Sequence, residues 1–163
     1  MAKGSKKDLI AQITLEVRMD QNRTYEFDDA ATGLLGINRT DLRCMDILGM
    51  RAPLTAGQLA EATGLTTGAV TAVIDRMESA GWVRRLRDST DRRRVLVEPT
   101  EKAFRESARI WGPVGQDFER LMSRYSADKL RVILDYLRQG AELDAKHLAR
   151  VKELAARRRG GSG

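Results

Sequence analysis

The sequence predicts a mainly α fold that contains one small β-hairpin. Apolar residues recur at helical spacings of three and four over most of the chain. Between Trp82 and Glu98 the period changes to two, as in β-strands. Two short helical stretches joined by a glycine turn come directly before this hairpin. The predicted fold class is therefore a winged helix-turn-helix, with a β-hairpin wing, flanked by N- and C-terminal helices.

The length and composition allow either one domain with a sizeable core or one compact module with oligomerisation arms. The chain has 163 residues, of which 42% are hydrophobic and 32% charged. The net charge of +6 favours an anionic partner, although many soluble proteins are basic without one. The sequence contains no run of eighteen apolar residues and no apolar signal core at the start. We therefore expect a cytoplasmic protein with no membrane partner.

The residue types exclude metal and redox centres as the main function. Cys44 and His147 are the single cysteine and histidine, so neither a disulfide nor a Cys/His metal cage can form within the chain. Cys44 lies on the apolar face of its predicted helix, which favours core packing over an oxidation sensor. The sequence has no Ser-His-carboxylate set and no glycine-rich phosphate loop. We expect no metal, no cofactor and no enzyme.

Residues 1–37 are predicted as N-terminal dimerisation helices. One helix runs from Lys6 to about Asn22 and a second passes through Tyr25 to Leu34. Gly33 and Gly36 mark the expected break.

Residues 38–99 carry the predicted DNA-binding domain. Its first helix is capped by Asn38 or Thr40 and ends near Pro53. Thr55 and Gln58 form a capping box for a short helix that Gly64 ends. Thr66 or Thr67 caps the next helix, which continues to about Ala80. The wing strands follow at Trp82–Arg87 and Arg94–Glu98.

Residues 100–156 are predicted as C-terminal dimerisation helices. Thr100 caps a long helix, with a kink expected at Gly112-Pro113, and Ser126 caps the last helix. Their apolar seams lack a partner within the winged module, which favours pairing with a second chain. Residues 157–163 are predicted as a flexible tail.

The stretch from Thr55 to Lys102 resembles the MarR family of winged-helix regulators. The resemblance is carried by LTAGQLAEATGL, TTGAVTAVIDRMESAGWV and RRLRDSTDRRRVLVEPTEKA. It implies a homodimeric transcriptional regulator, most simply a repressor that binds a palindromic operator in double-stranded DNA and is released by a ligand. Two positions depart from the family pattern. Ala72 stands where relatives often carry an arginine, and Pro99 replaces the usual leucine before Thr100.

The DNA contacts are expected on the second short helix and on the wing. Small and hydroxyl residues at the helix N-terminus suit close approach to the major groove, although the threonines could also serve as caps. Arg76 could reach a phosphate or pair with Asp75 or Asp91. The resemblance implies that Asp91 braces the wing tip and that Arg93 enters the minor groove. The predicted DNA-binding residues are Thr66, Thr67, Gly68, Ala69, Thr71, Ala72, Arg76, Arg87, Arg92 and Arg93.

Trp82 and Trp111 are candidates for a ligand pocket. Regulators of this kind often bind small aromatic anions between the dimer arms and the winged module, so the resemblance implies a small aromatic or anionic effector. Trp82 also suits the core, since it opens a strand. Two other functions stay open: a DNA-packaging protein without sequence preference, and a winged helix used for protein contacts.

Overall fold

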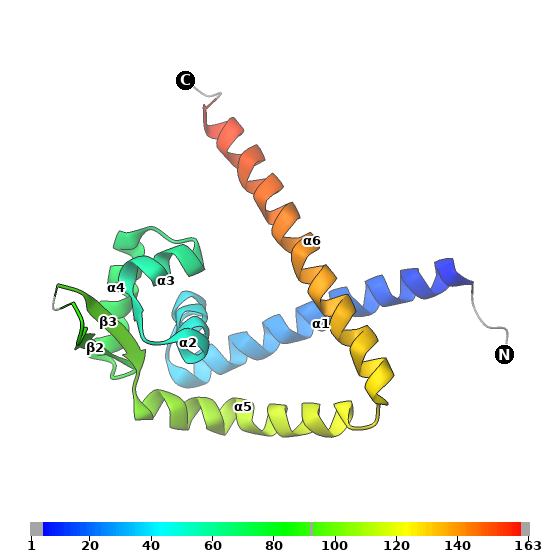
Figure 1. The fold of residues 1–163 in the computed structure, drawn as a ribbon, viewed down its shortest axis with the longest axis horizontal. Helices are drawn as coiled ribbons and strands as arrows, with labels where there is room; N and C mark the ends of the chain where they lie inside the picture. Colours follow the sequence, from blue (N-terminus) through cyan, green and yellow to red (C-terminus); the bar gives the residue numbers. More distant parts are fainter. Residues whose placement is uncertain (1–4, 92, 161–163) are drawn as a thin grey trace. The chain divides into compact units, whose positions relative to one another are not determined.

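The computed structural model describes residues 5–91 and 93–160. Contacts divide the chain into two compact units, residues 1–112 and residues 113–163. The first unit holds α1 to α4, the three strands and the start of α5 (Figure 1). The second holds the rest of α5 and α6. No helix among the described residues is long and apolar enough to cross a membrane.

The N-terminal segment forms one helix, α1 (Lys6–Leu35), and not the two helices predicted. Ser5 and Asp8 form a capping box at its start. The helix passes through Gly33 and ends at Gly36, which has a φ of 66°. The predicted break at Gly33 is wrong, because no proline or left-handed residue precedes Gly36 and the helical hydrogen bonds can continue.

The helix-turn-helix is confirmed. It consists of α3 (Ala56–Thr63) and α4 (Thr67–Ser79), and it follows α2 (Arg39–Arg51). The three N-caps are Asn38, Thr55 and Thr66, whose side chains accept hydrogen bonds from backbone amides of the first turn. Gly64, with a φ of 69°, makes the turn between α3 and α4.

The wing belongs to an antiparallel sheet with the strand order β1-β3-β2. Strands β2 (Val83–Arg87) and β3 (Val95–Pro99) form the predicted hairpin. The strand β1 (Leu54–Thr55) pairs with β3, placing Leu54 opposite Val97. The sequence analysis missed β1 because two residues are too short to show a period.

The core of the first unit lies between the helix-turn-helix and the sheet. Its buried apolar residues come from α2, α3, α4, β2 and β3. The start of α5 (Glu101–Met122) joins it, since Ala103 is buried and the Thr100 hydroxyl donates to the carbonyl of Gly81. The first unit therefore includes the start of α5 and extends to residue 112. The helix continues through Pro113, and the kink there stays a prediction.

The second unit leaves its apolar side chains exposed. Helix α6 (Ala127–Gly160) is continuous through Gly140. It extends into the segment 157–163 that the sequence analysis predicted as a flexible tail, because Ala155 and Ala156 and the arginines after them all favour helix. Residues 161–163 lie outside the described residues. The large exposed apolar side chains of this unit are Val114, Phe118, Leu121, Tyr125, Val132, Leu134, Tyr136, Leu137, Leu143, Leu148, Val151 and Leu154.

Candidate nucleic-acid interface

Helix α4 presents an exposed face of small side chains opposite its buried apolar side. Val70, Val73, Ile74 and Met77 are buried, as the sequence periodicity predicted. The exposed side starts at the N-terminus of the helix and carries only small side chains over its first two turns. Its members are Thr66, Thr67, Gly68, Ala69, Thr71 and Ala72. A helix with this surface can approach another molecule closely with its backbone.

Two of these threonines use their hydroxyl groups within the helix. The Thr66 hydroxyl caps the helix by accepting a hydrogen bond from the Ala69 amide at 3.2 Å. The Thr71 hydroxyl donates to the carbonyl of Thr67 at 2.9 Å. Thr66 therefore has the capping role that the sequence analysis left open. With its hydroxyl bonded to the helix, Thr71 can offer its methyl group to a partner.

Arg76 holds α4 against α2 and does not pair with Asp75 or Asp91. Its Nε donates to Oδ2 of Asp41 at 3.2 Å, and a second guanidinium nitrogen bonds Oδ1 of the same carboxylate. The Asp41 side chain is 2% exposed, whereas that of Arg76 is 49% exposed. The hydrogen bond to Asp41 raises the pKa of Arg76 above its already high value. Asp41 is also the third residue of the α2 capping box, so one carboxylate fixes both helices.

Three wing arginines are paired with carboxylates. Arg84 bonds Glu98 across the hairpin, with Nε 2.7 Å from Oε1. Arg85 turns back onto α4 and bonds both Asp75 and Glu78, which raises its pKa. Arg94 lies 3.6 Å from Asp88. These ion pairs stabilise the shape of the wing and its attachment to α4. Because each of the three arginines is paired with a carboxylate, its charge is partly compensated.

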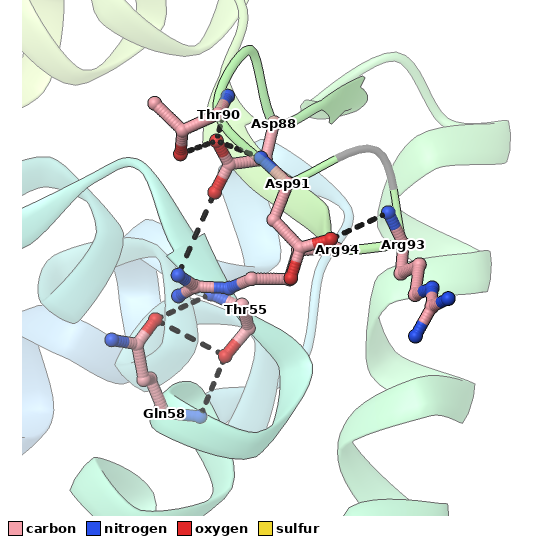
Figure 2. Close-up of polar contacts among 7 residues, drawn as sticks. All are labelled: Thr55, Gln58, Asp88, Thr90, Asp91, Arg93 and Arg94. Carbon is pink, nitrogen blue, oxygen red and sulfur yellow. Dashed lines mark hydrogen bonds and ion pairs between the residues drawn. The ribbon is translucent and has the colours of Figure 1, made fainter.

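The wing tip is organised by two aspartates (Figure 2). Asp88 accepts hydrogen bonds from the amide and hydroxyl of Thr90 at 2.8 and 2.7 Å, and these bonds lower the pKa of Asp88. Asp91 accepts from the Arg93 amide at 3.0 Å through its side chain, and from the Arg94 amide at 2.9 Å through its carbonyl. Together, the two aspartates form a network that fixes the backbone on both sides of the tip.

Arg93 and Arg87 project from this scaffold without an acidic partner among the described residues. In Figure 2, the Arg93 side chain points away from Asp88 and Asp91, whereas that of Arg94 points toward Asp88. Both Arg87 and Arg93 are exposed. Arg92 lies outside the described residues. The wing therefore offers at least two uncompensated guanidinium groups, the chemistry that recognises phosphates and narrow grooves.

The sequence analysis missed the roles of Asp41 and Asp88. The pairing of Asp41 with Arg76 joins residues 35 positions apart, and no local pattern predicts it. Asp88 could have been found, because an aspartate two residues before a threonine at a turn is typical of a side chain that bonds the backbone ahead of it.

Trp82 and Trp111 line one cavity of about 450 Å³ in the first unit. Trp82 is buried and Trp111 half-buried. The Lys102 ammonium lies 4.4 Å from the centre of the Trp82 ring, and Trp111 contacts Phe27 edge to face. Trp82 thus belongs to both the core and the cavity wall. The cavity is lined by Leu35, Ile37, Leu42, Met45, Asp46, Gly49, Met50, Trp82, Pro99, Ala103, Phe104, Ser107 and Trp111.

Cys44 is packed in the core, as predicted. It is 1% exposed, and burial is the main cause that raises the pKa of its thiol. The thiol is therefore protonated at neutral pH and shielded from oxidants. His147 is exposed on α6, with its Nδ1 3.4 Å from Nε of Arg150. The described residues contain no group of three or more side chains able to hold a metal ion.

Comparisons with known proteins agree with this geometry. The MarR family model matches residues 37–95. The uncharacterized HTH-type transcriptional regulator YcgE of Bacillus subtilis is 37% identical over 80% of this chain and 85% of its own length. The multiple antibiotic resistance protein MarR of Escherichia coli is 30% identical over 63% of this chain and 72% of its own length.

Solved structures share the fold. A MarR family protein from Bacillus stearothermophilus superposes with a TM-score of 0.64 at 20% identity, covering 87% of this chain and 99% of that one. A mutant of Escherichia coli MarR complexed with operator DNA gives 0.53 at 23% identity, covering 83% and 98%. NadR in complex with 4-hydroxyphenylacetate gives 0.55 at 22% identity, covering 85% and 94%. Members of this family are transcriptional regulators and not enzymes, and by its identity to its relatives this chain belongs to the MarR family.

Proposed function

We propose that this regulator binds a palindromic operator as a homodimer, with α4 in the major groove and the wing in the adjacent minor groove. The observation that carries the proposal is the pair of exposed wing arginines, Arg87 and Arg93, which have no acidic partner among the described residues. Strand β2 of this wing contacts α4, which carries the face of small residues. The first residues of a recognition helix contact base edges, and an arginine on a wing can read the width of the minor groove. The MarR mutant of the same fold was solved complexed with operator DNA, which supports DNA binding.

Dimerisation supports the proposal because one winged module covers little DNA. Two modules related by a twofold axis read two half-sites about 34 Å apart, one turn of the double helix. Within the first unit, Leu9, Ile10 and Ile13 of α1 are each more than half exposed. Within the second unit, the apolar residues of α6 are exposed along its length. Such surfaces are suited to contact with a second copy.

The cavity next to Trp82 and Trp111 is the proposed effector site. Its volume is in the range of small-molecule pockets, and its wall is mostly apolar. The cavity lies between α2 and the start of α5. Helix α2 also contacts the proposed recognition helix, α4, through the bond between Asp41 and Arg76. A ligand here could bias the position of the winged module and release the DNA, as expected of a repressor. The 4-hydroxyphenylacetate bound to NadR is a small aromatic carboxylate, which supports a small aromatic or anionic ligand.

The DNA interface can be tested without knowledge of the operator. Fluorescence anisotropy of mixed-sequence duplexes is measured over a range of salt concentrations for the wild type and three variants. Arg87→Ala and Arg93→Ala should each lower the slope of log affinity against log salt by about one for every phosphate that the variant no longer neutralises. Arg84→Ala is the matched control, since Arg84 is also on the wing but is paired with Glu98.

Two outcomes would contradict this interface. If Arg87→Ala and Arg93→Ala left the slope at the wild-type value, the wing would not contact DNA. If the wild type bound no duplex at any salt concentration, the protein-contact function would be favoured instead. Strong binding that shows no preference among duplexes in competition would favour the packaging function.

A further inference from the structure

The cavity of the proposed effector site contains one ionisable side chain, Asp46, among its described lining residues. The other lining side chains are apolar or aromatic, apart from the Ser107 hydroxyl and the glycine. No lysine, arginine or histidine of the described residues lines the cavity. Asp46 is therefore the one charged group among the described lining residues, and the Lys102 ammonium lies outside them, 4.4 Å from the centre of the Trp82 ring.

The Asp46 carboxylate has no ion pair or hydrogen bond within the described residues. Burial raises its pKa, and the nearby carboxylate of Asp28 raises it further. Asp46 is an exposed residue, so its carboxylate stays in contact with water and has no protein partner among the described residues that a ligand would have to displace. A cation or hydrogen-bond donor bound in the cavity could therefore pair with it directly.

The basic residues on the other side of Asp46 do not compensate it. Arg39 and Arg43 line a second hollow of about 390 Å³ that Asp46 also borders. Arg39 is held by Asp28 at 3.7 Å, by Asp29 at 3.5 Å and by the carbonyl of Tyr25 at 3.0 Å. Its guanidinium also stacks on the Tyr25 ring, 3.5 Å from the ring centre. Arg43 forms no ion pair with Asp46 in the described structure. Both arginines belong to the second hollow and not to the Trp82 cavity.

We propose that the Trp82 cavity takes a small aromatic ligand that carries a positive charge, an arylalkyl ammonium, with its ring against Trp82 and Trp111 and its ammonium on Asp46. This inference rests on the proposed effector function. Of the two properties that the sequence left open for the effector, it keeps the aromatic ring and rejects the negative charge. Aromatic walls favour a planar ring, and the cation is assigned to Asp46 because the Trp82 ring already has the Lys102 ammonium 4.4 Å from its centre. An anion beside Asp46 would lie against a like charge, since Lys102 bonds the carbonyl of Ala80 and is not among the lining residues.

The test uses three naphthalene probes of equal ring size and different charge. Isothermal titration calorimetry on the full-length protein measures 2-naphthylmethylammonium, neutral 2-naphthylmethanol and anionic 2-naphthoate. We expect the ammonium to bind at least about tenfold more tightly than naphthoate, as expected for a charge-assisted hydrogen bond. Asp46→Asn should abolish this preference while the neutral alcohol binds as before. Asp20→Asn, on the exposed part of α1, changes the net charge equally and should retain the preference.

The result that overturns the inference is naphthoate binding as tightly as the ammonium, or a cation preference that survives Asp46→Asn. Failure of all three probes to bind overturns it as well. The same protein preparations are titrated with duplex DNA. Retained DNA binding in any of these cases leaves the proposed regulator function in place and locates the failure in the ligand site.

Discussion

At the scale of single residues, the ion pair between Arg76 and Asp41 holds α4 against α2. The Asp41 carboxylate is buried and depends on Arg76 and on the Asn38 amide for its hydrogen bonds. Removing one partner of a buried pair leaves the other with its full desolvation cost. Arg76 is therefore first a structural residue, and any phosphate contact it makes comes from its exposed half.

Arg76→Ala should lower the free energy of unfolding by about 1–3 kcal/mol, because the Asp41 carboxylate then loses its charged partner. Urea denaturation followed by circular dichroism measures this change. Arg84→Ala is the control, since its pair with Glu98 is at the surface and should contribute at most about 1 kcal/mol. Equal losses in the two variants would contradict the structural role of Arg76.

The sequence predicted those features of the site that depend on neighbouring residues, and it missed those that depend on contacts between distant residues. The small-residue face of α4 follows from the helical period, and the Thr66 cap from its place before that period begins. The partner of Arg76 could not be predicted, because Asp75 is adjacent in sequence whereas Asp41 reaches it only through the packing of α2 on α4. Likewise, sequence alone does not tell that Arg84 and Arg85 are paired while Arg87 is not.

At the scale of elements, helix ends were predicted better than helix continuity. The caps at Asn38, Thr55 and Thr66 are local signals that the structure confirms. The prediction of two helices before residue 37 was wrong, because α1 continues without interruption between Asn22 and Tyr25. Gly33 stays within α1, and a side chain there would meet no atom within 4 Å. Gly36 ends α1 because its φ of 66° favours glycine.

Alanine substitutions at these two glycines should have opposite effects. Gly33→Ala should raise the free energy of unfolding by about 0.5–1 kcal/mol, since alanine favours helix and the space is open. Gly36→Ala should lower it by about 1–2 kcal/mol, since an L-residue is strained at positive φ. Urea denaturation of both variants provides the measurement. A loss of stability for Gly33→Ala similar to that for Gly36→Ala would argue for a break at Gly33.

At the scale of the whole molecule, the exposed apolar seams predict a dimer at low micromolar concentration. Light scattering after size-exclusion chromatography should give twice the chain mass of 18.2 kDa. Leu137→Glu should shift the protein toward the monomer, because Leu137 lies on the apolar seam predicted for α6. The seam consists of Leu130, Ile133, Leu134, Leu137, Ala141, Leu148 and Val151. Val132→Glu should leave the protein dimeric, because Val132 is 69% exposed on the same helix but lies off that seam. A monomeric wild type, or equal effects of both variants, would contradict the dimer.

The central claim is that a twofold dimer reads an inverted repeat through α4 and the wing. Selection of binding sites from random double-stranded DNA near physiological salt, in parallel with Arg93→Ala, tests it most directly. We expect an enriched inverted repeat with half-sites one helical turn apart. Arg93→Ala should bind the selected duplex more weakly by about 1–3 kcal/mol while remaining folded. Binding that enriches no motif, or a motif bound equally well by Arg93→Ala, would contradict this account.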